Sequence, residues 1–277
     1  MAILYVNDGG SDTSPYDTWA KAANLLEDAL ADAACVADST IYMQSDHSEA
    51  ARGQDVVLVN ATGAVATPIK VISVTNTNEP PESGDYENMV DGGGSIDTTD
   101  GAYDLTVTGF IVFVGIYLKI GDDFNLANTE KMTFFHDSKI QVADNITIGI
   151  AGDGGTEWYD VDYVQETGGV FSIGGNWVWR GGSFSFGGGG SVSTSWIQPS
   201  TNRGGNVWIE DVDIQDMDAG DYLVKDTKAS HVINIIRCKI PAAVNYMNAG
   251  PEVPCIVNFH SVDDGDNIFT FKEYRSQ

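Results

Sequence analysis

The residues best suited by type and spacing to do chemistry are the acidic residues between positions 210 and 221. Enzymes that cleave polysaccharides use paired carboxylates, one as a general acid and the other as a base or nucleophile. Strand alternation would point Asp211 and Asp213 to one face, and Asp216 follows closely. The chain holds 40 acidic residues, however, so such pairs also arise by chance. We therefore predict no catalytic site, and Asp211, Asp213 and Asp216 are the first candidates only if the chain is an enzyme.

Basic residues that would assist these carboxylates are sparse. Abstraction of a proton beside a sugar carboxylate needs local positive charge, and a formal net charge of −26 opposes it. Arg180 and Arg203 lie in glycine-rich segments, and the first base after the acidic run is Lys225. The sequence therefore favours a non-enzymatic protein, with a polysaccharide lyase or hydrolase as the alternative.

Two short acidic turns, GDDFN at 121–125 and DDGDN at 263–267, offer the oxygen ligands that Ca²⁺ prefers. Neither has the full twelve-residue calcium loop with its terminal Glu, so solvated turns are the favoured interpretation. The sequence has no HExxH, no paired CxxC, no phosphate loop that ends in Gly-Lys-Ser/Thr, and no nucleophile elbow. We predict no bound metal and no cofactor.

Isolated histidine and cysteine residues add little chemistry. His47 follows a strand pattern beside Asp46 and Glu49, and we expect it on the surface. Three cysteines far apart imply no disulfide framework. Cys238 and Cys255 lie in apolar runs, and they are expected to be small buried side chains rather than ligands or nucleophiles.

Closely spaced tryptophans offer a second candidate site. Trp177 and Trp179 are two residues apart, so they project to the same side of a strand, and Trp196 follows. Such a ledge could bind a glycan. Packing in the core or at a subunit interface is the favoured interpretation.

An amphipathic helix of about four turns is predicted near the start, capped by Asp17 or Thr18. Its apolar face would carry Trp19, Ala22, Ala23, Leu26, Ala29, Leu30 and Ala33. Such a helix can close the end of a stack of β-strands, whose last strands would otherwise expose apolar side chains.

Short apolar or alternating runs then recur between turns rich in Gly, Asn and Asp. One marker for each run, Leu118, Ile140, Val164, Phe184, Ile209 and Ile236, gives steps of 22, 24, 20, 25 and 27 residues. Such a period indicates a solenoid of stacked coils. Two alternating runs around DDGDN predict a C-terminal β-hairpin. We expect an N-terminal strand and helix over 1–50, coils over 51–245, and a hairpin or cap over 246–277.

The composition excludes some partners. An acidic surface repels nucleic acid and anionic membranes, although acidity also serves solubility. The first residues lack the basic and apolar regions of a signal peptide, and no run is long enough to span a membrane. We expect synthesis in a cytoplasm, with assembly into a particle left open.

Three segments near the start of the chain form a recognisable series: YVNDGGSDTSPYDTWAKAANLLEDAL, STIYMQSDHSE and the strand VISVTN. This opening resembles that of right-handed parallel β-helix proteins of the pectate-lyase-like superfamily, most closely those found among bacteriophage virion proteins. In that family a Tyr-Val-Asn/Asp-x-x-Gly-Ser-Asp turn precedes a Trp-containing amphipathic helix and a Thr-Ile-Tyr-Val strand. The match is specific over residues 1–50, and the remainder is similar only in its irregular strand repeats. The resemblance implies a three-faced helix of parallel strands with residues of successive coils stacked inside.

Together these observations predict an all-β, right-handed parallel β-helix with an N-terminal capping helix and a C-terminal hairpin. The expected function is that of a structural virion protein, a homotrimer that decorates or cements the capsid or forms part of a tail fibre. Its partners would be sister subunits and the major capsid or another virion protein. The alternatives are a tailspike-like depolymerase and a non-catalytic glycan-binding module.

Overall fold

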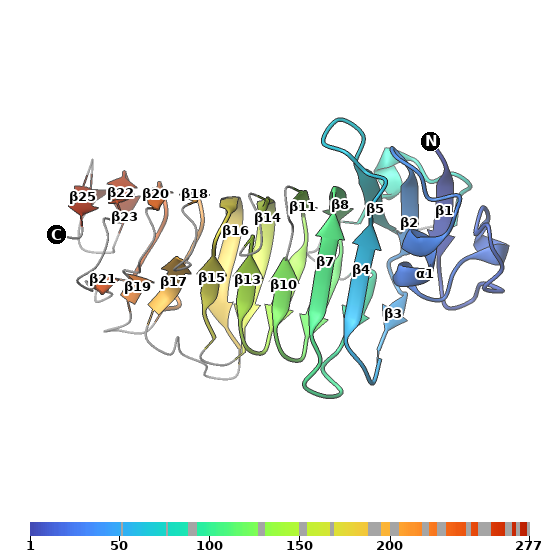
Figure 1. Cartoon of the computed structure of the whole chain (residues 1–277), viewed down its shortest axis with the longest axis horizontal. Coiled ribbons are helices and arrows are strands. Elements are labelled where there is room, and N and C mark those ends of the chain that lie inside the picture. The colour runs from blue at the N-terminus through green and yellow to red at the C-terminus, as the bar shows by residue number, and fades with distance from the viewer. Residues whose placement is uncertain are drawn as a thin grey trace. The chain divides into compact units, whose positions relative to one another are not determined.

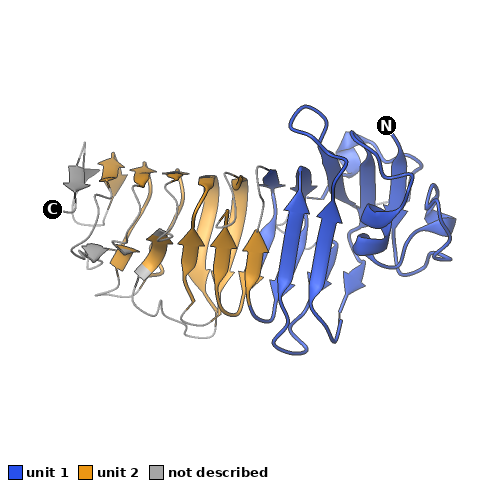
Figure 2. Ribbon diagram, in the orientation of Figure 1, with its two compact units in different colours: residues 1–122, 131–140 blue, residues 123–130, 141–277 orange. Residues whose placement is uncertain are grey.

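The structure is a computed structural model of the 277-residue chain (Figure 1). It describes residues 1–50, 52–75, 77–87, 93–126, 131–149, 154–166, 169–187, 195–199, 205–217, 222–225, 231–241, 245–248, 256–263, 268–269 and 272–275. The chain forms two compact units (Figure 2). Unit 1 holds residues 1–122 and 131–140, and unit 2 holds residues 123–130 and 141–277.

Unit 1 contains three sets of parallel strands that the chain visits in turn. The first set is β1 (Ile3–Val6), β2 (Thr40–Gln44), β5 (Ile69–Val74), β8 (Ile111–Val114) and β11 (Met132–His136). The second set is β3 (Ser48–Glu49), β6 (Ser95–Asp97) and β9 (Tyr117–Ile120). The third pairs β4 (Val56–Asn60) with β7 (Leu105–Gly109) (Figure 1). The 3₁₀ turn η2 (Ser83–Asp85) lies between β5 and β6, and β12 (Lys139–Val142) crosses the division between the units.

Unit 2 contains two ladders of parallel strands. One ladder is β10 (Phe124–Leu126), β13 (Ile146–Ile148), β15 (Phe171–Ile173), β17 (Ser195–Pro199), β19 (Tyr222–Lys225) and β21 (Asn245–Asn248). The other is β14 (Gly155–Gln165), β16 (Asn176–Phe186), β18 (Asn206–Glu210), β20 (Val232–Ile236) and β22 (Ile256–His260). All of these pairs are parallel, so the predicted all-β fold of parallel strands is confirmed.

Antiparallel pairing occurs at the C-terminal end of unit 2. β25 (Lys272–Arg275) pairs with β22, and β23 (Val262–Asp263) pairs with β24 (Ile268–Phe269). The predicted hairpin is therefore present between Ile256 and Arg275, although the DDGDN turn lies outside the described residues beyond Asp263.

A left-handed backbone residue bends each strand of the second ladder in unit 2 at the same level. These residues are Asp160, Gly181, Asp211, Arg237 and Ser261, with φ of 52°, 73°, 57°, 51° and 51°. After the bend the chains pair again through bridges that join Ser183, Asp213, Lys239 and Asp263 in turn. The corner costs energy at each non-glycine position, because left-handed φ brings Cβ close to the following carbonyl oxygen. Stacked corners let each coil turn without losing the ladder to its neighbour.

Burial alternates along the strands, with apolar side chains inside. In β18 the side chains of Val207 and Ile209 are fully buried, while Asn206 and Trp208 face outward. Large aromatic side chains fill the interior of unit 2, and Trp158, Trp177, Trp179 and Trp196 have no exposed surface. Ring centroids of neighbouring tryptophans lie 5.3 to 6.1 Å apart. Contacts at this distance are typical of tilted and edge-to-face aromatic packing.

The predicted four-turn helix is wrong in extent. The chain forms only a 3₁₀ turn η1 (Trp19–Lys21) and a six-residue helix α1 (Leu26–Ala31). Between them Ala23 pairs with β1, because its N–H donates to Tyr5 O and its carbonyl accepts from Asn7 N, both at 2.9 Å. Tertiary pairing thus overrides helix propensity. Six of the seven apolar side chains are nevertheless buried as predicted, whereas Ala33 is exposed. The ring of Trp19 packs with its centroid 4.6 Å from that of Tyr5.

The predicted runs fall on strands, but their markers do not share one register. The ladder aligns Trp158, Trp179, Ile209, Ile235 and Phe259, at steps of 21, 30, 26 and 24 residues. Phe184, taken as the marker before Ile209, pairs instead with Tyr163 beyond the corner. Turns of unequal length between strands hide this register in the sequence.

Candidate functional site

The predicted acidic run begins at the end of β18, where arginines from both neighbouring strands bind it. Arg237 donates from Nε to Asp211 Oδ1 at 2.8 Å and from one terminal nitrogen to Asp211 Oδ2 at 2.7 Å. The same nitrogen lies 2.5 Å from Glu210 Oε1. On the other side, Arg180 Nε donates to Glu210 Oε2 at 3.0 Å. Glu210 is thus held between two guanidinium groups, and Asp211 is bound by that of Arg237.

These contacts shift the pKa values of the two carboxylates in the direction opposite to that needed by a general acid. The hydrogen bond from Arg237 holds the pKa of Asp211 below its usual value. The pKa of Glu210 is also lowered, first by the hydrogen bond from the Trp208 indole and then by Arg237. A general acid that protonates a glycosidic oxygen needs a raised pKa. The geometry around Glu210 and Asp211 therefore suits ion pairing rather than acid catalysis.

The other two candidate carboxylates have separate partners. Asp213 lies beyond the corner, where Lys239 Nζ is 3.2 Å from its Oδ2. Asp216 Oδ2 accepts a hydrogen bond from the Phe186 N–H at 2.8 Å. Because the strand bends at Asp211, Asp211 and Asp213 do not share one flat strand face, and that expectation was wrong. The structure does not bring Asp211, Asp213 and Asp216 together as one site.

An exposed group of aromatic and polar side chains lies beside these ion pairs. We define the Trp208 face as Tyr159, Arg180, Trp208, Glu210, Asn234 and Asn258. Trp208 is 36% exposed, and its indole nitrogen donates to Glu210 Oε2 at 2.9 Å. Arg180 lies over the Tyr159 ring, 5.8 Å from its centroid. An exposed indole held by a hydrogen bond presents a fixed apolar surface.

Strand register places planar amides next to that indole. Trp208 pairs with Asn234 on β20, and Asn234 pairs with Asn258 on β22. Asn258 Nδ2 donates to Asn234 Oδ1 at 3.0 Å. Each amide keeps hydrogen-bonding capacity beyond this contact, because an amide has two donor hydrogens and two acceptor lone pairs. The Trp208 face therefore combines a flat ring with donors and acceptors at strand spacing.

The tryptophans predicted as a possible glycan platform are not on the surface. Trp177, Trp179 and Trp196 are fully buried, and Trp177 stacks on Phe171 with centroids 4.9 Å apart. The favoured core interpretation of these residues is confirmed, and a glycan ledge at Trp177 and Trp179 is excluded by their burial. Sequence reasoning missed Trp208, although its position between buried Val207 and Ile209 signals an outward side chain.

The first acidic turn is partly tied down by backbone contacts. Asp123 Oδ1 accepts from both the backbone and the side-chain nitrogen of Asn145, each at 3.0 Å. Burial, followed by the charge of Asp123, raises the pKa of Asp144. Asp123 thus has a structural role in joining successive turns of unit 2. That neither acidic turn binds Ca²⁺ stays a prediction from the sequence, and most of the second turn lies outside the described residues.

His47, expected on the surface, is buried within a charged network in unit 1. Its side chain has no exposed surface, and Nδ1 lies 2.7 Å from Asp8 Oδ1, although without the alignment of a hydrogen bond. Nε2 lies 3.4 Å from Glu49 Oε1. Both ring nitrogens therefore face carboxylates, and the expected surface position was wrong. Local sequence patterns do not show the contact with Asp8, because Asp8 is 39 positions away.

Glu49 is the centre of that network. Its carboxylate is fully buried, and it accepts from Leu26 N at 2.5 Å and from an Arg52 guanidinium nitrogen at 2.6 Å. Arg52 continues to Glu27 at 2.7 Å. Leu25 caps α1 with no side-chain hydrogen bond of its own, so Glu49 supplies the missing acceptor at the start of the helix. The network joins α1 to β3 and has a structural function.

The cysteines have no reactive environment among the described residues. Cys35 and Cys238 are both buried free thiols, and burial raises the pKa of each to about 11. The predicted burial of Cys238 is confirmed. Cys255 and Arg203 lie outside the described residues, as does the side chain of Lys225.

A scan of protein families, a search of curated proteins and a search of solved structures each find no match for this chain. Within the described part of the chain, no helix has the length and apolar character needed to cross a membrane.

We predict that Glu49→Gln strongly destabilises the protein. The change removes a charge from a buried ion pair and leaves Arg52, only 6% exposed in its side chain, short of a partner. Breaking a buried pair costs about 3–5 kcal/mol in free energy of unfolding. Asp38→Asn is the control, because Asp38 and Lys70 form an exposed pair worth about 1 kcal/mol or less. Urea unfolding measures both variants, and equal losses would contradict the role given to Glu49.

We also predict that Arg237→Gln raises the pKa of Asp211 toward its ordinary value, because it removes the two hydrogen bonds that favour the carboxylate. A lowered folded-state pKa stabilises the fold above the ordinary pKa, and this contribution is lost as pH falls through the folded value. NMR titration of the Asp211 carboxyl carbon measures the shift. Lys239→Gln is the control, since Lys239 binds Asp213. An Asp211 pKa that does not move in Arg237→Gln would refute this account.

Proposed function

We propose that the chain is a non-enzymatic structural protein of a bacteriophage virion, which decorates or cements the capsid or forms part of a tail fibre. It acts by binding to the particle and to sister copies. The observation that carries the proposal is the fate of the candidate catalytic carboxylates: Asp211 and Asp213 are held in ion pairs with Arg237 and Lys239. Groups held in this way stabilise a surface and are poorly placed for proton transfer.

The finer fold belongs to the same proposal. We infer that the parallel ladders are coils of a right-handed β-helix of the pectate-lyase-like kind, as the opening residues suggest. Three features support this inference: strand sets visited in turn, stacked corners, and rows of buried side chains in each unit. A body built in this way is rigid, because the strands inside each ladder are paired on both sides. A rigid body presents its outer faces for binding at little entropic cost.

We predict that the purified chain co-sediments with virion shells assembled without it and protects those shells against disruption. Shells of an unrelated phage are the control, because an acidic protein with a charge of −26 would associate with any basic surface without specificity. Specific binding should persist as salt is raised to physiological strength. A chain that remains in the supernatant with its own shells would refute the structural assignment.

A second candidate function, glycan binding, is favoured by the Trp208 face. An exposed indole provides an apolar surface for the C–H side of a sugar ring, and the neighbouring amides of Asn234 and Asn258 provide partners for hydroxyl groups. The acidic surface disfavours anionic polysaccharides, so the expected ligand is neutral. This candidate replaces the earlier one at Trp177 and Trp179, which are buried.

For this candidate we predict that Trp208→Ala abolishes retention on an immobilised neutral polysaccharide, because the stacking surface is lost. Val178→Ala is the matched control, since Val178 is the strand neighbour of Trp208 on β16 and lacks an aromatic ring. Affinity electrophoresis measures retention, and circular dichroism confirms that both variants are folded. Equal retention of the two variants, or no retention of the unmodified chain, would reject glycan binding at this face.

A further inference from the structure

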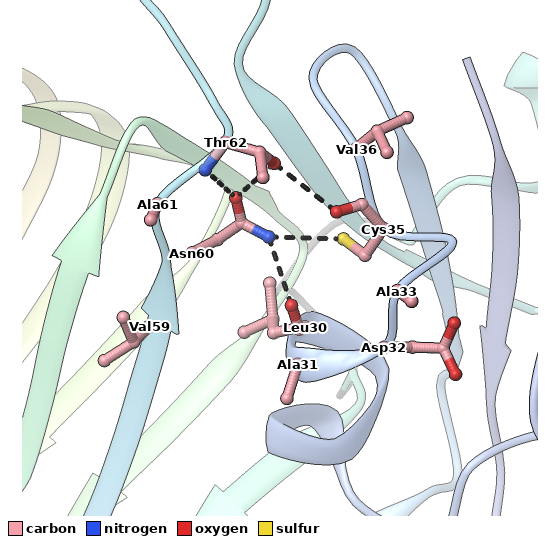
Figure 3. A pocket seen from close by; sticks show the side chains of 10 residues that line it. All are labelled: Leu30, Ala31, Asp32, Ala33, Cys35, Val36, Val59, Asn60, Ala61 and Thr62. Carbon is pink, nitrogen blue, oxygen red and sulfur yellow. Dashed lines mark hydrogen bonds between the residues drawn. The ribbon is translucent and has the colours of Figure 1, made fainter.

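A cavity of about 350 Å³ opens between the end of α1 and the end of β4 in unit 1. Its rim carries Val36 and Val59, which are 44% and 45% exposed. Cys35 and Asn60, each 3% exposed, lie at its base (Figure 3). Exposed valines beside an open cavity are unfavourable in water, so this region has the character of an unoccupied binding surface.

The polar atoms at the base already have partners inside the chain. Asn60 Nδ2 donates to Leu30 O at 3.1 Å and to Cys35 Sγ at 3.4 Å (Figure 3). Its Oδ1 accepts from Thr62 N at 2.9 Å and from Thr62 Oγ1 at 2.7 Å. A ligand that entered would find these hydrogen bonds in use. The cavity therefore selects an apolar group rather than a polar one.

An apolar group of suitable size projects from the next loop of the same unit. Ala64 and Thr67 exchange two backbone hydrogen bonds, of 3.2 and 3.0 Å, which hold Val65 at the tip of the loop between β4 and β5. Val65 is 68% exposed, so it does not fill its own cavity. Val65 is three positions from Thr62 at the cavity wall, a span of at most about 11 Å. The protruding valine and the cavity thus lie near each other.

Charge favours a second copy of the chain as the partner. Two copies that each carry −26 repel wherever acidic surfaces meet. Residues 56–69, which include β4, one wall of the cavity and the Val65 loop, contain no charged side chain, and Asp32 is the one charged residue among those that line the cavity. Two copies can approach along this segment without bringing like charges together, whereas a basic partner would be drawn to the acidic surfaces instead.

We propose that two copies associate through this segment, with Val65 of each copy inserted into the Cys35 cavity of the other. A surface that carries both a protruding side chain and a cavity is complementary to a second copy of itself. A two-fold axis then places each valine in the cavity of the other copy. This contact does not depend on the virion assignment, and it gives pairs rather than the three copies expected from sequence. One loop and one cavity bury less than the roughly 1,200 Å² of a stable interface, so the pair forms in a concentration-dependent manner.

Sedimentation equilibrium across protein concentrations tests this contact. The unmodified chain should move from one copy to two, and Val65→Asp should remain single because it places a charge in an apolar cavity. Ala33→Trp should also remain single, because the indole fills the cavity from an exposed position. Gly84→Asp is the charge-matched control in unit 1, where a side chain meets no neighbouring atom, and it should pair normally.

Circular dichroism checks that each variant is folded. The three changed positions, Ala33, Val65 and Gly84, are exposed, so we expect the substitutions to change association and not folding. The proposal is overturned if the unmodified chain stays single up to about 1 mM. It is also overturned by a pair that survives both Val65→Asp and Ala33→Trp, or by association into three copies. Shell binding by a chain that never pairs would leave the virion proposal standing while this one fails.

Discussion

The in-register pairing of parallel strands is the constraint on which the rest of the structure depends. Because the register is kept from strand to strand, a residue's neighbours lie one coil earlier and one coil later, which in unit 2 means 21 to 30 positions away in the sequence. Left-handed corners at Asp160, Gly181 and Asp211 keep the register through the bend. Glycine at 182 is required there, since a Cβ would lie 2.1 Å from Val161 O. A side chain added at that position would force adjacent coils apart.

Register also determines the chemistry of the surface. Glu210 lies between Arg180 and Arg237 because β18 lies between β16 and β20. A chain with 40 acidic residues and 14 basic ones thereby uses several of its few bases to neutralise carboxylates on neighbouring strands. Carboxylates that look like a catalytic cluster along the sequence are separated in space and paired individually. The same geometry makes Trp208 and the two asparagines a continuous outward face.

Sequence patterns predicted the strands and most of the core, because burial on one side of a strand produces alternation that is visible locally. They assigned Cys238 correctly to the interior, and they favoured burial of Trp177 and Trp179. Contacts between residues far apart in the sequence could not be predicted from these local patterns. The helix from Asp17 to Ala33 is interrupted because Ala23 pairs with β1, and His47 is buried because Asp8 and Glu49 converge on it. Markers such as Phe184 were misaligned because unequal turns separate the coils, and no local pattern encodes those lengths.

Disulfide cross-linking between β20 and β22 tests the central claim of in-register parallel pairing most directly. Asn234 pairs with Asn258, and neighbouring strands lie about 4.8 Å apart, within reach of a disulfide. The account predicts that Asn234→Cys with Asn258→Cys forms a bond under mild oxidation, detected by the mass of the linked peptides. Asn234→Cys with His260→Cys, two residues out of register, should stay reduced. Cross-linking only in the second pair, or equally in both, would contradict the register and the account built on it.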